Sequence, residues 1–286
     1  MTEAVRVERD TASHISRVVI ARAETGNTIS LEMAAALRDA FAALAQDDAI
    51  KVIVLSAEGN DLTRGFDPAQ VETMYKQAPG GSSKKLPSQR ARLMAHDALW
   101  WGPDGLYSRI LHCPKVTVLA AKGLCLEVGL YLALCCDLVL ADDSARFGNP
   151  RWRHVGVDGD ISMLCAAVGL KRAKELLIFA VQWTAEQAQA YGLVDEVVAP
   201  AELEPAALKL AALCTQVMRD GIAAEKHVVF ASLAKMQIGT GFATAAAVGA
   251  WASNVHFRPG EFNFLRAVRE DGLASALAAA QAHAAP

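Results

Sequence analysis

The segment RHVGVDGD, residues 153–160, gathers side chains that can move protons near neutral pH. It holds two carboxylates, Asp158 and Asp160, and one imidazole, His154, four residues before Asp158. Such groups act as general acids or bases when they lie within hydrogen-bond reach of a reacting atom. Asp beside Gly is equally typical of a tight turn in a solvated loop. The segment by itself leaves both interpretations open.

A second candidate group lies in CLEVGLYL, residues 125–132, where a helix is predicted to begin near Val128. The first N–H groups of a helix have no partner within the helix and form the positive end of its dipole, so they suit an oxyanion. Glu127 precedes this helix and is either a base or a favourable charge beside the dipole. Tyr131 is one turn beyond Glu127, and either donates to an oxyanion or packs in the core.

The elements that must position these groups follow a strand and helix pattern. VRVERD (5–10) and ISRVVIAR (15–22) predict a hairpin-like pair of strands, and IKVIVLSAEG (50–59) predicts a buried strand. Between them Ser30 is a predicted helix N-cap, followed by apolar residues at helical spacing: Met33, Leu37, Phe41 and Leu44. Strand, helix and strand in this order predict a right-handed crossover and a largely parallel sheet.

The same alternation returns after residue 112. Strands are predicted at KVTVLAA and LVLAD and helices at VGLYLALCCD and RAKELLIFA. Thr184 and Gln187 in TAEQ form a predicted capping box. From about Pro200 the pattern is helical alone, so we divide the chain into a core, residues 1–200, and a C-terminal helical segment, residues 201–286.

The stretch HDALWWGPDGLYSRIL, residues 96–111, predicts an irregular helical cover. Its His96, Trp100 and Trp101 could line an apolar substrate pocket, because aromatic rings shape such sites, or they could simply pack.

Composition limits the class of protein. The chain has 286 residues, 53% hydrophobic and 21% charged, which indicates a globular protein with a large core. A net charge of −3 gives no reason to expect nucleic acid or an anionic membrane as partner. The N-terminus has no apolar signal core, and charges interrupt the most apolar span, so neither a leader nor a membrane span is predicted. Six Cys without paired spacing indicate reduced core thiols, a cytoplasmic location and no metal site.

Five motifs taken together resemble the crotonase (enoyl-CoA hydratase/isomerase) superfamily over most of residues 5–215. They are GNTIS, GNDLTRGFD, CPKVTVLAAKG, ALCCDLVLADDSARFGNP and TAEQAQAYGLVDEVV. The resemblance implies an α/β fold, a crotonase-like spiral of ββα units followed by a C-terminal helical trimerisation segment. It also implies a homotrimer or a dimer of trimers, with coenzyme A bound as part of the substrate and no tightly bound cofactor.

In that family two backbone N–H groups hold the thioester oxygen as it becomes an enolate, an oxyanion hole aimed at charge that develops during the reaction. The resemblance assigns these donors to Phe66, in RGFD, and to Val128, at the predicted helix start. Val128 stands where the family has Gly, so its N–H is available only if its φ is negative.

The chain departs from the family at both acid–base positions of the hydratases. Where they carry LGGGCE this chain has LEVGLY, which places Tyr131 at the Glu position; their second Glu follows FGQP, whereas Arg151 follows FGNP here. Asp158 resembles an Asp of the naphthoate-synthase and ketocyclohexane-carboxyl-CoA hydrolase branch, and Asp160 matches better an Asp of a β-diketone hydrolase branch. Arg151 could pair with these acids or with a substrate carboxylate.

These features predict a lyase or hydrolase that acts on an acyl-CoA through a stabilised enolate, by ring-opening C–C hydrolysis or its reverse rather than by standard hydration. Three alternatives stay open: an atypical enoyl-CoA hydratase or isomerase, a hydrolase of cyclic β-diketones that needs no CoA, and a non-catalytic scaffold that binds acyl-CoA.

Overall fold

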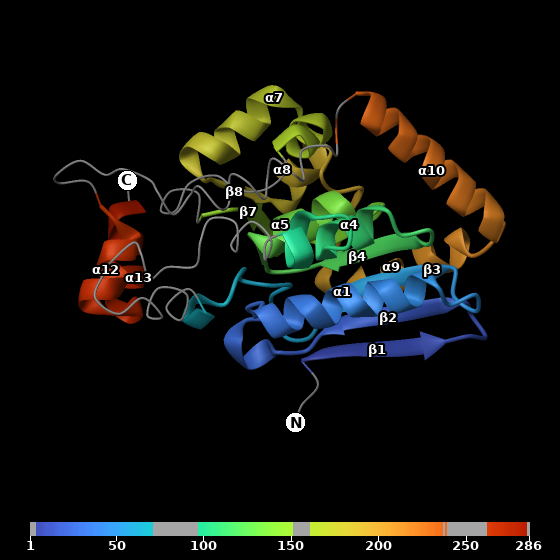
Figure 1. Ribbon diagram of the computed structural model, residues 1–286, viewed down its shortest axis with the longest axis horizontal. Coiled ribbons are helices and arrows are strands. Elements are labelled where there is room, and N and C mark those ends of the chain that lie inside the picture. Colours follow the sequence, from blue (N-terminus) through green and yellow to red (C-terminus); the bar gives the residue numbers. More distant parts are fainter. Residues whose placement is uncertain (1–3, 71–96, 151–160, 237, 239–261, 285–286) are drawn as a thin grey trace.

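The computed structural model describes residues 4–70, 97–150, 161–236, 238 and 262–284. Its centre is a six-stranded sheet (Figure 1). In their order across the sheet the strands are β1 (Val5–Asp10), β2 (Ile15–Ile20), β3 (Val52–Ala57), β4 (Val116–Ala121), β6 (Leu138–Asp142) and β9 (Glu196–Val198). β1 and β2 pair antiparallel and every later pair is parallel, which confirms the predicted hairpin and the largely parallel sheet.

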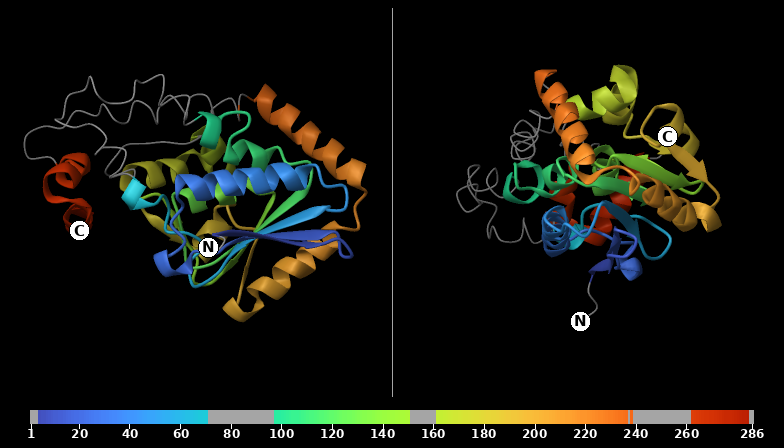
Figure 2. Two further views of the ribbon diagram at one scale, coloured as in Figure 1. Left: turned by 60° about the horizontal axis from the view of Figure 1, so that its bottom comes forward. Right: turned by 90° about the vertical axis from the view of Figure 1, so that its right-hand side faces the viewer.

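Two helices cover the faces of this sheet. Helix α1 (Leu31–Ala45) lies on one face and α9 (Leu203–Cys214) on the other (Figure 2). Ser30 caps α1 by accepting a hydrogen bond from the Met33 N–H, as predicted. The four apolar residues expected to face the core of the sheet, Met33, Leu37, Phe41 and Leu44, are all buried. On the opposite face, α9 buries Leu203, Ala207 and Ala211 against residues of β2, β3, β4 and β6.

A second, three-stranded sheet was not predicted. It consists of β5 (Leu124–Leu126), β7 (Arg146–Gly148) and β8 (Gln182–Thr184). Strands of three residues are too short to show an alternating pattern, which explains the omission. This sheet matters for function because α5 (Val128–Cys135) begins after a single residue, Glu127, beyond the end of β5.

Most of the remaining helices lie above the large sheet in the view of Figure 1. The predicted irregular cover is a π-helix, η3 (Asp97–Trp101), followed by α4 (Leu106–Leu111). Helix α7 (Ile161–Phe179) is broken at Gly169, and α8 (Ala185–Ala190) begins with the predicted capping box of Thr184 and Gln187. Single 3₁₀ turns lie at Ala23–Thr25 (η1) and Pro200–Glu202 (η4).

Beyond residue 200 the described residues are helical, as predicted: after α9 come α10 (Arg219–Lys235), α12 (Phe264–Asp271) and α13 (Leu273–Ala284). The last two pack on each other through Phe264, Val268, Ala276 and Ala280 (Figure 1). The division of the chain at residue 200 and the role of these helices in trimer formation stay predictions. No helix within the described ranges has both the length and the apolar character needed to cross a membrane.

All six cysteines lie in described parts of the chain and are free thiols, as expected. Cys113, Cys125, Cys135 and Cys136 are buried. Burial raises the pKa of the Cys125 and Cys136 thiols far above the usual value, because the thiolate would lose its hydration.

We therefore expect Cys125 and Cys136 to resist alkylation in the folded protein. With iodoacetamide at pH 8, mass spectrometry of the peptides should show less than about one-tenth of the labelling that each residue reaches after unfolding in guanidinium, since only the thiolate reacts. Equal labelling in the folded and unfolded protein would contradict the burial of these side chains.

Candidate active site

The loop that carries Phe66 is fixed by a neighbouring turn of the chain. Asn27, in GNTIS, is 1% exposed, and its side-chain amide donates to the backbone carbonyls of Glu58 and Asp61, at 2.8 Å each. Its own backbone is in the left-handed region, with φ of 55°, which Asn tolerates better than most residues. The motifs GNTIS and GNDLTRGFD thus describe one structural unit in which the first segment holds the second.

Backbone hydrogen bonds set the direction of the Phe66 N–H. The Ile29 N–H donates to the Gly65 carbonyl at 2.8 Å, and the Asp67 N–H donates to the Ile29 carbonyl at 2.9 Å. These two bonds form a parallel bridge between Ile29 and Phe66. In such a bridge the N–H groups of successive residues point to opposite sides, and those of Gly65 and Asp67 share a side. The Phe66 N–H consequently points away from the turn at Ile29.

The other side of the same loop runs beside β5. The Thr63 N–H donates to the Leu124 carbonyl at 2.9 Å, and the Leu126 N–H donates to the Thr63 carbonyl at 3.0 Å. Because β5 leads directly into α5, this pairing brings Phe66 to the start of that helix. The two donors that the resemblance assigned to an oxyanion therefore lie in the same region of the fold.

The start of α5 has an unusual backbone. Glu127 has φ of 51° and ψ of −101°, a region that residues with a side chain rarely adopt, and its N–H donates to the Gly148 carbonyl at 2.9 Å. Val128, the next residue, is the first of the helix and is absent from the residues of positive φ. Because its φ is not positive, the Val128 N–H meets the condition set above for a donor at a position where the family has Gly. Within the described parts of the chain this N–H donates no hydrogen bond.

The side chain of Glu127 is bound to the predicted donor on the other segment. Its Oε2 accepts a hydrogen bond from the Phe66 N–H at 3.0 Å. Gly65 makes room for this contact: it has φ of 102°, and a Cβ there would lie 2.7 Å from both Cδ and Oε2 of Glu127. The sequence predicted that Glu127 is either a base or a favourable charge beside the helix dipole. Neither prediction includes this contact with Phe66, which lies 61 residues earlier in the chain.

The side chain of Phe66 lies at the edge of a cluster of aromatic rings. Trp100 packs edge-on to Phe66 with ring centroids 6.1 Å apart, and Trp101 packs edge-on to Tyr131 at 4.8 Å. Tyr107, which the sequence had not singled out, contacts both Trp rings and lies 5.3 Å from the Tyr131 ring. Trp101, Tyr107 and Tyr131 are 2–3% exposed. The ring of Tyr131 thus packs in the core.

Five of the predicted site residues, His96, Arg151, His154, Asp158 and Asp160, lie outside the described residues. Their roles stay predictions. The chain on both sides of the acidic segment is nevertheless placed. Before the segment, the Gly148 carbonyl accepts a hydrogen bond from the Glu127 N–H, and Asn149 is fully buried. After it, α7 begins at Ile161.

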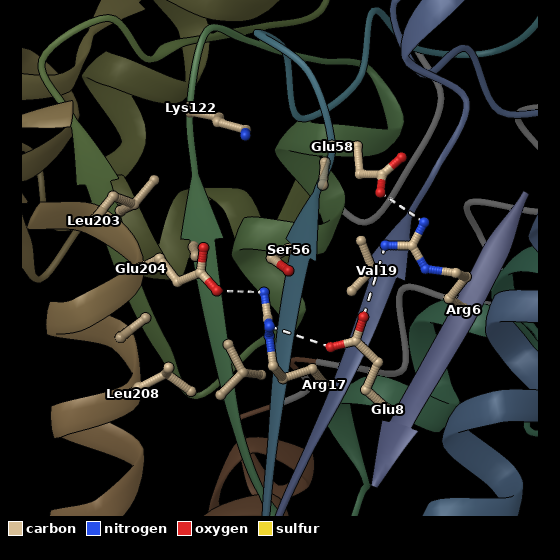
Figure 3. A pocket seen from close by; sticks show the side chains of 14 residues that line it. Arg6, Glu8, Arg17, Val19, Ser56, Glu58, Lys122, Leu203, Glu204 and Leu208 are labelled. Carbon is tan, nitrogen blue, oxygen red and sulfur yellow. Dashed lines mark ion pairs between the residues drawn. The ribbon is translucent and has the colours of Figure 1, made fainter. Parts of the chain in front are cut away.

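A hollow of about 330 Å³ lies elsewhere, between the outer face of the sheet and α9 (Figure 3). A chain of ion pairs crosses it: Arg17 contacts Glu204 at 2.6 Å and Glu8 at 3.1 Å, and Arg6 contacts Glu58 at 2.6 Å. The lining has three basic and three acidic side chains, namely Arg6, Arg17, Lys122, Glu8, Glu58 and Glu204. Because these formal charges cancel, the hollow has no evident preference for an anionic ligand such as a phosphate.

The comparisons with known proteins agree with this arrangement. The sequence profile described as "Enoyl-CoA hydratase/isomerase" matches residues 10–264. The chain belongs to this family. A putative enoyl-CoA hydratase of Thermus thermophilus is 31% identical over 248 residues, which cover 86% of this chain and 91% of that protein. A 4-chlorobenzoyl coenzyme A dehalogenase of an Arthrobacter species is 26% identical over 194 residues, 66% of this chain and 65% of that protein.

Solved structures show the same fold. The crystal structure of an enoyl-CoA hydratase/isomerase from Xanthobacter autotrophicus Py2 matches with a TM-score of 0.80 and 25% identity, over 99% of each chain. An enoyl-CoA hydratase from Mycobacterium smegmatis matches with a TM-score of 0.81 and 22% identity, over 99% of this chain and 95% of that one. The predictions of a crotonase-like α/β fold and of a crotonase-superfamily enzyme are therefore confirmed.

The two hydrogen bonds by which the Asn27 amide holds the Phe66 loop, here called the clamp, can be tested with Asn27→Asp. The substitution keeps the shape of the side chain and its tolerance of positive φ, but it removes two donors and turns a carboxylate oxygen toward the carbonyls of Glu58 and Asp61. We expect the free energy of unfolding in urea to fall by on the order of 3 kcal/mol. Asn60→Asp is the matched control, because Asn60 is exposed in the same loop, and it should change stability by less than about 0.5 kcal/mol. Equal stabilities of the two variants would contradict the clamp.

Proposed function

We propose that this protein acts on an acyl-CoA thioester whose oxygen is held, as an enolate, by the N–H groups of Phe66 and Val128. The observation that carries the proposal is the hydrogen bond from the Phe66 N–H to a carboxylate oxygen at 3.0 Å, beside the first turn of α5. It supports the proposal because this donor already accommodates the oxygen of an acidic group. Donors fixed by the surrounding backbone need no reorganisation as charge develops, which is how an oxyanion hole lowers a barrier.

Ordinary hydration is not the reaction we propose. Hydratases of the family use two Glu carboxylates, and the first position is Tyr131 here. That ring is 3% exposed and packed among Trp101 and Tyr107, so the position offers no carboxylate. The second position is Arg151. A positioned acid or base typically contributes roughly 10²–10⁴-fold to a rate, so the loss of both is severe.

We propose ring-opening C–C hydrolysis of a cyclic β-ketoacyl-CoA instead, with Asp158 or Asp160 as the base. The base takes a proton from water, whose oxygen adds to the ketone carbon. The bond from that carbon to the carbon next to the thioester then breaks, and its electron pair forms the thioester enolate, which is finally protonated on carbon. The product has a new carboxylate, with which Arg151 would pair, and His154 would orient the base or the water.

The fold supports the placement of the acidic segment near the thioester. The described chain before residues 151–160 ends with Gly148, whose carbonyl accepts from the Glu127 N–H, with the buried Asn149 and with Pro150. The segment thus starts three residues after Gly148, whose carbonyl is bonded to the residue that precedes Val128. Trp100, Trp101 and His96 would form the acyl side of the pocket. Coenzyme A as part of the substrate, a trimeric or hexameric assembly and a cytoplasmic location belong to the same proposal.

Hydration of crotonyl-CoA is the first test. We expect turnover at least about 10²-fold below that of a family member with both Glu residues, because the acid–base pair is missing. Loss of the enoyl absorbance of crotonyl-CoA gives the rate, and a two-Glu hydratase assayed in parallel is the control. Comparable rates for the two enzymes would refute the argument from the missing carboxylates.

The base is tested with Asp158→Asn and Asp160→Asn, assayed on 2-ketocyclohexane-carboxyl-CoA. Mass spectrometry should show a product that has gained one water and kept CoA. Replacement of the base should lower turnover by about 10²-fold or more, and the other variant serves as its matched control. Full activity in both variants would exclude both carboxylates, and absence of the hydrated product with the parent protein would exclude the reaction.

A further inference from the structure

We propose that Glu127 is an internal ligand of the oxyanion site and thereby determines which acyl-CoA the protein accepts. The proposal rests on the assignment of the Phe66 N–H as a thioester donor. In the structure this N–H donates to the Glu127 carboxylate, at 3.0 Å. A substrate oxygen must displace that carboxylate, so only a strong acceptor competes well.

The local backbone is arranged for this contact. Glu127 has φ of 51° and ψ of −101°, a conformation that glycine adopts without strain. A long acidic side chain nevertheless occupies this position. Such a conformation costs free energy and persists only when the surrounding structure holds it. Here the Glu127 N–H donates to the Gly148 carbonyl, which holds the backbone in place. The side chain consequently starts from a fixed point between β5 and α5.

The space for the carboxylate is provided from the opposite segment. Gly65 has no side chain, and a Cβ on its backbone would lie 2.7 Å from both Cδ and Oε2 of Glu127. The neighbouring acid cannot replace Glu127 at this donor without breaking another contact, since Asp67 is 8% exposed and its Oδ2 is paired with Arg22 at 2.8 Å. The N–H of Phe66 thus meets a carboxylate that comes from a distant part of the sequence.

The identity of the preferred substrate follows from the strengths of the competing bonds. A hydrogen bond to an ionised acceptor is roughly twice as strong as one between neutral groups. The carbonyl of a saturated thioester is neutral and competes poorly with a carboxylate. The oxygen of a β-ketoacyl-CoA shares the negative charge of a readily formed enolate and competes on equal terms. Glu127 therefore selects thioesters with an acidic carbon next to the carbonyl.

Calorimetric binding of two probes tests this selection. Acetoacetyl-CoA, which enolises, and butyryl-CoA, which does so far less, are titrated into the parent protein, Glu127→Gly and Glu127→Gln. We expect Glu127→Gly to bind butyryl-CoA about tenfold more tightly than the parent does, which is the ratio expected when a charged competitor is removed. Its affinity for acetoacetyl-CoA should change less, so that the preference between the probes narrows. Glu127→Gln provides a neutral acceptor of the same length, so its affinity for butyryl-CoA should lie between those of the parent protein and Glu127→Gly.

Hydrogen exchange provides a readout that needs no ligand. In Glu127→Gly the peptide that contains Phe66 should exchange faster than in the parent protein, because the acceptor of this amide is gone. Glu186→Gln, which alters an exposed acid in the first turn of α8, is the control and should leave both exchange and binding unchanged. Thermal unfolding of each variant verifies that it is folded, and Gly suits the backbone of residue 127.

The outcomes separate this inference from the proposed function. Unchanged exchange at Phe66 in Glu127→Gly refutes the internal ligand whatever the protein binds. If exchange at Phe66 is faster in Glu127→Gly but the ratio of the affinities for acetoacetyl-CoA and butyryl-CoA is the same as in the parent protein, only the role of Glu127 in substrate selection is refuted. Faster exchange without binding of either thioester by any variant refutes the proposed function, and with it the selection that rests on it.

Discussion

The position of one backbone N–H, that of Phe66, depends on hydrogen bonds along both sides of a single loop. On one side the loop is paired with Ile29 and held by the Asn27 amide. On the other side it is paired with β5, which leads into α5. These bonds lie between segments far apart in the sequence, so the site forms only when the parallel sheet has brought them together. The site is therefore a property of the complete core rather than of a local motif.

Sequence patterns predicted the elements that bury a regular apolar face. The hairpin of β1 and β2, α1 with its Ser30 cap, and the capping box at Thr184 all produce local signals, because a strand or a helix repeats its buried positions at a fixed interval. The three-residue strands β5, β7 and β8 carry no such repeat. The family motifs pointed to Phe66 and Val128 through their backbone positions. The structure places Phe66 beside the residue that precedes α5, and the role of both N–H groups stays a prediction.

The contact between Glu127 and Phe66 could not be predicted in the same way. It depends on a positive φ at a residue type that rarely adopts one, and on the room left by Gly65. A sequence motif shows that a Gly is missing, but it does not show where the replacing side chain points. Likewise Tyr107 joins the aromatic cluster through the packing of α4 and η3, and its spacing in an irregular segment gives no indication of its face. Sequence departures from the family pattern are thus informative only once the geometry is known.

We propose that the Phe66 and Val128 N–H groups receive a thioester oxygen, which displaces the Glu127 carboxylate from Phe66. A crystal structure of the protein with a bound β-ketoacyl-CoA tests this most directly. We expect the thioester oxygen within about 3 Å of both nitrogens, a normal hydrogen-bond distance, with the Glu127 carboxylate moved away from Phe66. A bound thioester whose oxygen lies elsewhere, with Glu127 still accepting from the Phe66 N–H, would contradict it.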